Sequence, residues 1–91
     1  MQLWKLVDWD SAKNELLKKE RHVSFEDVEE AIKRDCLVEI VPNQKRYAHQ
    51  RVFVVVIRSY VYNVPFVEDE QKIFLKTIIP NSRATRKYLS K

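Results

Sequence analysis

The sequence contains no glycine, and its 91 residues include one cysteine and three prolines. Loops that hold nucleotide phosphates need a close backbone approach that glycine permits, so P-loop nucleotide hydrolases and glycine-fingerprint dinucleotide enzymes are excluded. A single cysteine excludes an internal disulfide, and no stretch resembles a secretory signal. A reducing, cytoplasmic environment is therefore expected.

Long apolar runs and clustered metal ligands are missing as well. No run approaches the ~20 apolar residues of a membrane helix, so no membrane association is expected. His22, His49 and Cys36 lack paired ligand spacing, which argues against a zinc site, and no cofactor is expected. Cys36 opens an apolar strand and is interpreted as a small core residue. No local signature supports a Cys–His or Ser–His–Asp catalytic group.

What is present fits one domain over residues 1–91 with a single modest core. The net charge of +4 is unevenly distributed. Acidic residues gather at 26–30 and 68–70, and cations gather at 13–21, at 44–51 and in the C-terminal PNSRATRKYLSK. Segregated cations attract phosphates or an acidic protein, although a mixed, solvated surface explains the same pattern.

Two helical patterns open the chain. DWDSAKNELLKKER predicts a helix capped by Asp10 or Ser11, with an apolar stripe of Ala12, Leu16 and Leu17. SFEDVEEAIKR predicts a second helix, in which Ser24 and Asp27 have the spacing of a capping box. Its acidic residues come first and its cations last, as the helix dipole favours.

The rest of the chain reads as strands and a final helix. The fold class expected is α+β, with two N-terminal helices packed on one face of a four-stranded, mainly antiparallel sheet and a short C-terminal helix. The other face is left partly open, where a groove could lie. Pro65 predicts a bulge or a free edge. The elements expected are strands at 36–42, two within 51–67 turning near Arg58–Ser59, one at 72–79, and a helix from Asn81 or Ser82 to about Leu89.

Cations and aromatic residues are the side chains left to carry chemistry. Cations hold phosphates and rings stack on bases, so the set suits single-stranded RNA. It also suits metal-free cleavage, in which the 2′-hydroxyl attacks its own phosphate. We expect the cations to converge over the open sheet face; Tyr60 and Tyr62 read equally well as half-buried sheet residues. The catalytic candidates are Arg51, His49, Lys76, Arg83, Arg86 and Tyr88, and the RNA-binding candidates are Lys18, Lys19, Arg21, Lys45, Arg46, Tyr60, Tyr62 and Lys87.

Two blocks of the sequence resemble the BrnT-type toxins of bacterial type II toxin–antitoxin systems. The first is DWDSAKNELLKKERHVSFEDVEEA, which matches the family's Trp-Asp opening and its Val-Ser-Phe-Glu-like turn into the second helix. The second is IIPNSRATRKY, which matches the closing strand and basic segment. The middle of the chain is similar mainly through HQRVFVVVI.

The resemblance implies a RelE/ParE-like fold and a toxin that cleaves RNA to stop translation. It also implies a ribbon-helix-helix antitoxin as partner, with operator DNA bound only through that antitoxin. By position, Arg51 matches the arginine before the family's central strand, and Arg83 and Arg86 fall within its basic terminal segment.

Two positions depart from the family pattern. Ser82 stands where the family often has arginine, which bears on the catalytic assignment, and no glycine separates His22 from Val23, which bears on the turn between the helices. Two further functions therefore stay open beside the ribonuclease toxin: a non-catalytic RNA- or protein-binding module of the same fold, and a gyrase-poisoning toxin, which rests on fold analogy alone.

Overall fold

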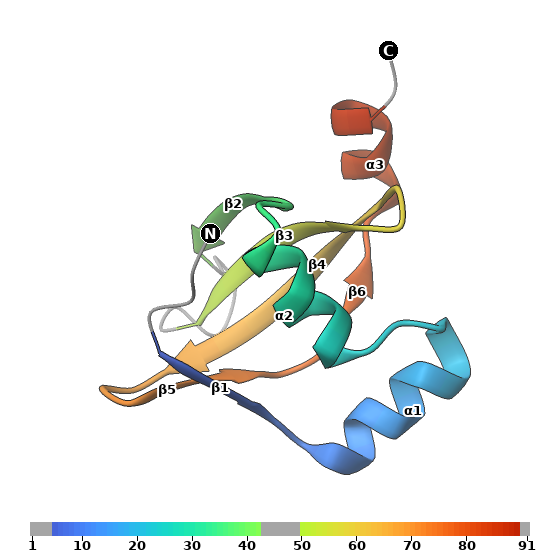
Figure 1. Ribbon diagram of the computed structural model, residues 1–91. Helices are drawn as coiled ribbons and strands as arrows, with labels where there is room; N and C mark the ends of the chain where they lie inside the picture. Colours follow the sequence, from blue (N-terminus) through green and yellow to red (C-terminus); the bar gives the residue numbers. More distant parts are fainter. Residues whose placement is uncertain (1–4, 43–49, 90–91) are drawn as a thin grey trace.

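A computed structural model describes residues 5–42 and 50–89 of the chain (Figure 1). Within these residues the chain forms a mixed α/β fold with three helices and one six-stranded sheet. The elements in order are β1 (Leu6–Trp9), α1 (Ser11–Arg21), α2 (Phe25–Lys33), β2 (Leu37–Pro42), β3 (Arg51–Ile57), β4 (Tyr60–Glu68), β5 (Lys72–Leu75), β6 (Ile79–Pro80) and α3 (Ser82–Leu89).

The two N-terminal helices begin where their caps predict. The Asp10 carboxylate accepts a hydrogen bond from the backbone N–H of Ala12 at 3.1 Å. Ser24 and Asp27 form the complete capping box of α2. His22 ends α1 with φ 56°, the left-handed conformation that glycine normally supplies at this position. The turn without glycine is therefore made by His22 itself.

The expected apolar stripe of α1 is confirmed at Leu17 and wrong at Ala12 and Leu16. Ala12 and Leu16 are exposed, whereas Asn14 and Leu17 are buried. The inward face of the helix is therefore shifted around its axis relative to the face predicted from apolar spacing. A polar residue can take a buried position when both its donor and its acceptor are satisfied, as they are for Asn14.

The sheet has the strand order β1-β5-β4-β3-β2, and β6 pairs with β4. Strands β2 to β5 form the antiparallel meander that the sequence predicts. The four-stranded count is wrong, because β1 was not predicted; it adds in parallel to β5 at the sheet edge. Only Val7 and Trp9 of its four residues are partly buried, so its apolar alternation is too short to distinguish a strand from a loop.

The single strand expected over residues 72–79 is also wrong, because a bulge divides it into β5 and β6. Phe66 pairs with Leu75 and Asn63 pairs with Ile79, so three residue steps on β4 face four on the opposing chain. The extra residue reverses the alternation beyond Leu75: Ile78 is fully buried and Ile79 is 44% exposed. The bulge lies beside Pro65, whose carbonyl accepts from the Lys76 N–H at 2.8 Å.

The β3–β4 hairpin turns at Arg58–Ser59, where the sequence places it. Both residues are left-handed, with φ of 49° and 65°. This pair of positive angles matches the right-handed twist of the flanking strands, which is why asparagine and glycine usually occupy it. Arg58 is held in place by a hydrogen bond to the His22 carbonyl and an ion pair with Asp27 at 3.4 Å.

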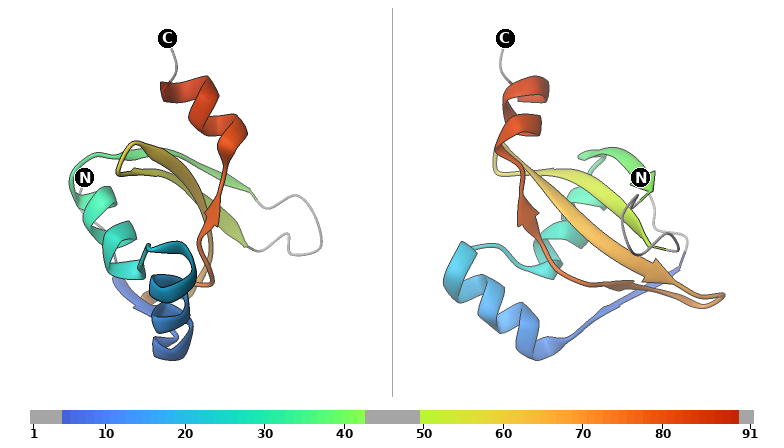
Figure 2. Two further views of the ribbon diagram at one scale, coloured as in Figure 1. Left: turned by 90° about the vertical axis from the view of Figure 1, so that its right-hand side faces the viewer. Right: turned by 180° about the vertical axis from the view of Figure 1, so that it is seen from behind.

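The main core lies between α2 and one face of the sheet (Figure 1). Phe53 and Phe66 stack at its centre, with ring centroids 3.9 Å apart. Cys36 is partly buried and packs against this core. Viewed from behind, the sheet lies in front of α2 (Figure 2). In every view α3 and α1 lie at opposite ends of the molecule. None of the helices in residues 5–42 and 50–89 has the length and apolar character needed to cross a membrane.

Candidate functional site

A groove of about 270 Å³ lies between α3 and the sheet face opposite α2, which we call the open face. Its volume is just below the ~300–1,000 Å³ of pockets that enclose a whole small ligand. The residues lining this α3 groove are Glu39, Val41, Val54, Asn63, Asn81, Arg83, Ala84, Lys87 and Tyr88.

Strand register explains why three strands contribute to the floor. Glu39 pairs with Val54, and Val54 pairs with Asn63, so the three side chains lie in a row on the same face. Neighbouring positions such as Phe53 point the other way, into the core under α2. The floor is thus part apolar and part polar.

Helix α3 is fixed over this floor by polar contacts with β4. The backbone of Asn81 donates to the Val61 carbonyl at 2.9 Å, and Thr85 Oγ1 accepts from the Val61 N–H at 2.9 Å. The Asn81 side chain caps the helix by accepting from the Ala84 N–H at 2.9 Å and donates to Asn63 Oδ1 at 3.2 Å. These bonds set the orientation of every α3 side chain in the groove.

A close acid–phenol pair spans the groove. The Tyr88 hydroxyl donates to Glu39 Oε2 at 2.6 Å. This hydrogen bond raises the pKa of the Tyr88 hydroxyl, and burial and the carboxylate charge act in the same direction. Lys87 Nζ lies 5.4 Å from the centroid of the Tyr88 ring, which places its ammonium beside the pair.

Arg83 adds a second cation to the groove. Its side chain is exposed, and within the described part of the chain it makes no ion pair. An arginine in this state keeps its five donors for a ligand, and its planar group suits phosphate oxygens. Arg86, three residues along α3, is exposed too but does not line the groove. Arg83 thus lines the groove and Arg86 does not, although the two residues are only three positions apart on α3.

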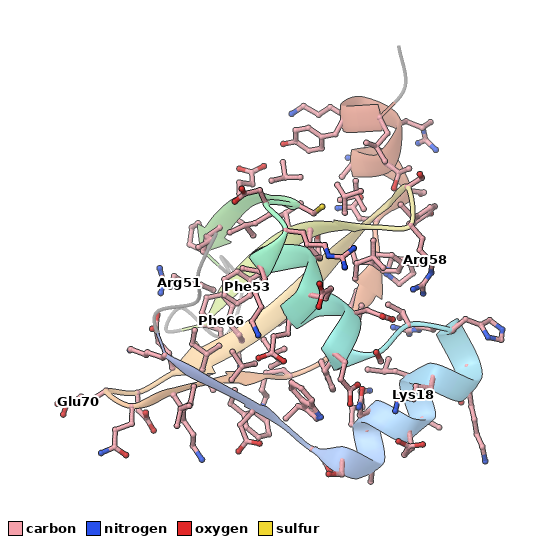
Figure 3. The ribbon with its side chains drawn as sticks, viewed as in Figure 1. Lys18, Arg51, Phe53, Arg58, Phe66 and Glu70 are labelled. Atoms are coloured by element: carbon pink, nitrogen blue, oxygen red, sulfur yellow. The ribbon has the colours of Figure 1, made fainter. Side chains whose placement is uncertain are left out.

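The expected convergence of cations is not met for Arg51. Arg51 pairs with Phe66 across β3 and β4, so it lies on the face that α2 covers rather than on the open face. Its guanidinium is 5.3 Å from the Phe66 ring centroid and forms an ion pair with Glu68. Figure 3 places Arg51 and Arg58 at opposite ends of β3. Arg51 is therefore engaged with its own sheet, away from the groove.

Three other candidates lie outside the groove. Tyr60 and Tyr62 share a face, as predicted, with ring centroids 5.4 Å apart. That face is the α2 side, where Tyr62 packs against the core, so the interpretation as half-buried sheet residues fits them. Lys76 is exposed, and its Nζ lies 5.7 Å from the Phe74 ring centroid on β5.

The cations of α1 lie at the other end of the molecule (Figures 1 and 3). Lys18 pairs with Glu15 on the same helix at 3.1 Å, and the Arg21 guanidinium donates to the Ile78 carbonyl, which ties α1 to the chain before β6. Lys19 is exposed on the same helix. The remaining candidates, Lys45, Arg46 and His49, lie outside the described residues.

Sequence reasoning missed Glu39, Asn63 and Asn81 as groove residues. From sequence, Asn81 reads only as a helix cap, and Glu39 is an isolated acid in an apolar strand. A signal existed for Glu39, because a charged residue between Val38 and Ile40 identifies the outward-facing position of β2. Its pairing with Tyr88, 49 residues away, depends on the tertiary fold.

Comparison with known proteins finds no matching family model, no similar curated protein and no similar solved structure. The similarity to BrnT-type toxins accordingly rests on the two sequence blocks quoted above.

Proposed function

We propose that this protein binds single-stranded RNA in the α3 groove and cleaves it without a metal ion, as the toxin of a type II toxin–antitoxin pair. The observation that carries the proposal is the gathering of Arg83, Lys87 and Tyr88 over Asn63 and Asn81 in one groove. Two cations provide phosphate contacts, and the exposed Tyr88 ring provides a stacking surface. The Asn63 amide, whose oxygen already accepts from Asn81, provides N–H donors for base edges.

The toxin assignment adds the sequence resemblance to this geometry. The resembling C-terminal block, IIPNSRATRKY, supplies Arg83, Lys87 and Tyr88 of the groove. In this proposal the protein acts in the cytoplasm, has a RelE/ParE-like fold, and is neutralised by a ribbon-helix-helix antitoxin. An antitoxin that covers the groove would present acidic side chains to the same cations.

Arg83 and Arg86 provide a matched pair for testing the groove. We expect Arg83→Ala to weaken binding of a fluorescein-labelled single-stranded RNA and to reduce its salt dependence by a slope of ~0.7, the value for one lost phosphate contact. Arg86→Ala removes the same charge outside the groove and should have a smaller effect on both. Fluorescence anisotropy at several salt concentrations measures both quantities; equal losses in the two variants would contradict the assignment.

Cleavage is tested separately from binding. The purified protein should cut RNA in the presence of EDTA, either free or in a cell-free translation reaction, and its expression alone should arrest growth until an antitoxin gene is co-expressed. Ser82, where the family often has arginine, favours the second candidate, a non-catalytic RNA-binding module. Binding without cleavage in either reaction would select that second function.

A further inference from the structure

The α3 groove holds one carboxylate among its lining residues, and that carboxylate is held in a defined position. Glu39 extends from β2 on the open face, and the Tyr88 hydroxyl donates to its Oε2 at 2.6 Å. Its other oxygen, Oε1, makes no hydrogen bond to a described residue. A carboxylate held through one oxygen keeps the second oxygen available to accept a proton from a ligand.

We propose that Glu39 is the catalytic proton acceptor of this groove and that it takes the proton of the attacking ribose 2′-hydroxyl. This inference rests on the proposed RNA cleavage and adds its chemical mechanism. The other ionisable groups of the groove cannot fill the role. Arg83 and Lys87 are cations and have no acceptor. The raised pKa of the Tyr88 hydroxyl keeps its proton in place, which makes it a donor.

The reaction then balances with groups of the groove alone. The 2′-hydroxyl proton moves to Glu39 Oε1 as the 2′-oxygen forms a bond to phosphorus. The bond from phosphorus to the 5′-oxygen breaks, and the leaving oxygen takes a proton from the Lys87 ammonium. Arg83 stabilises the charge on the non-bridging oxygens. The products are a 2′,3′-cyclic phosphate and a 5′-hydroxyl; Glu39 then releases its proton to water and Lys87 regains one.

Tyr88 acts as a positioning residue in this scheme. Its hydrogen bond orients the Glu39 carboxylate, and Tyr88 is 38% exposed, which leaves ring surface for a base. Lys87 Nζ, 5.4 Å from the ring centroid, lies on the same side of α3. The competing explanation is that the Glu39–Tyr88 bond only ties α3 to β2. A tie of that kind affects stability, whereas a proton acceptor affects the rate and its dependence on pH.

The decisive variant is Glu39→Gln, which keeps the size of the side chain and can still accept from Tyr88. We expect single-turnover cleavage to fall about 10²–10⁴-fold, the usual contribution of a general base. Binding of the same RNA should be unchanged or tighter, because a negative charge leaves the groove. The acid limb of the wild-type pH–rate profile should disappear. Tyr88→Phe, which keeps the ring, should lower the rate by less and retain that limb.

The chemistry of the products tests the proposal on the wild-type protein, independently of whether any variant folds. RNA with a single 2′-deoxyribose at the cleavage position should resist cleavage, and mass spectrometry of the products should find 2′,3′-cyclic phosphate ends. Products with 3′-hydroxyl ends, or cleavage by Glu39→Gln at the wild-type rate, would overturn the role of Glu39 alone. A wild-type protein that binds RNA and never cleaves it would overturn the proposed nuclease itself.

Discussion

At the scale of single residues, Asn14 is the most deeply buried polar residue in the described part of the molecule. It is a polar residue with 3% exposure, and both ends of its amide are used. Oδ1 accepts from the Phe25 N–H at 2.8 Å, and Nδ2 donates to Glu26 Oε1 at 2.8 Å. Asn14 thus satisfies a free N–H in the first turn of α2 and joins that turn to α1.

Replacing Asn14 should cost more than its size suggests. In Asn14→Ala the buried Phe25 N–H loses its partner, and an unsatisfied buried donor costs about 1–3 kcal/mol. We expect a loss of this size in the free energy of unfolding, measured by urea denaturation. Lys19→Ala, at an exposed position of the same helix, should remain within about 0.5 kcal/mol of wild type. Equal effects would mean that the Asn14 bonds contribute little.

Glu26 makes the same contact sensitive to acid. The hydrogen bond from Asn14 is the largest cause that lowers the Glu26 pKa from its ordinary 4.5, and its own backbone N–H, Lys18 and Ser24 act in the same direction while burial opposes them. Because the pKa is lower in the folded state, this stabilisation is complete above the ordinary value of 4.5 and is lost as the pH falls through the lower folded-state pKa. Glu26→Gln removes this titrating group and should therefore flatten the fall in stability between about pH 5 and about pH 3. Urea denaturation midpoints across that pH range measure the effect. An unchanged dependence of the midpoint on pH would refute the linkage.

At the scale of elements, α3 differs from the other two helices because none of its residues is buried. Tyr88 and Leu89 are 38% and 40% exposed. A helix with so little apolar contact gains little stability from packing, so its placement depends on the bonds to β4 through Asn81 and Thr85. The geometry of the groove depends on the same few bonds.

Thr85→Val tests that dependence with a nearly isosteric change. The Thr85 hydroxyl accepts from the N–H of Val61, a residue with 0% exposure, so its removal leaves a buried donor unpaired. We expect a loss of about 1–3 kcal/mol, together with faster amide hydrogen exchange at Val61 and weaker RNA binding. Thr85→Ser retains the hydroxyl and should keep the exchange protection. Protection at Val61 that survives in Thr85→Val would contradict this role.

The sequence predicts the helices and turns that are determined by interactions between residues close together in the chain. Ser24 and Asp27 define the start of α2 within three residues, and the turn at Arg58–Ser59 lies between two apolar runs. By contrast, β1 forms a strand by pairing with β5, which lies far away in the sequence. Its first residue, Leu6, pairs with Lys72, 66 positions further along the chain. The bulge before Ile78 likewise depends on the partner strand. Long-range pairing of this kind leaves little trace in a local pattern.

The candidate site follows the same division. Arg83, Lys87 and Tyr88 could be predicted because one helix carries them all. Arg51 could not be placed from sequence, because one step of strand register decides which face a side chain occupies. Glu39 could be assigned to the outward-facing position of β2, but its contact with Tyr88 depends on the tertiary fold.

At the scale of the whole molecule, several cations outside the groove are paired with acids within residues 5–42 and 50–89. Lys5 and Arg51 both contact Glu68, Arg58 contacts Asp27, and Lys72 contacts Asp8. Figure 3 shows Arg51 on the opposite side of the molecule from Lys18 and Arg58. Part of the positive charge of the described residues is therefore offset locally by acids. The attraction for phosphate should instead concentrate where cations have no acidic partner.

Comparing Arg51→Ala with Lys87→Ala tests this distribution of charge. Both variants remove one positive charge, so any effect of net charge alone is the same. Lys87 lines the groove, and its loss should lower the slope of log K against log salt by ~0.7 for single-stranded RNA. Arg51 is engaged by Glu68 and Phe66, so its loss should leave that slope near wild type and should shift stability by about 1 kcal/mol or less. A larger effect of Arg51→Ala than of Lys87→Ala on the slope would move the RNA site from the open face to the side that α2 covers.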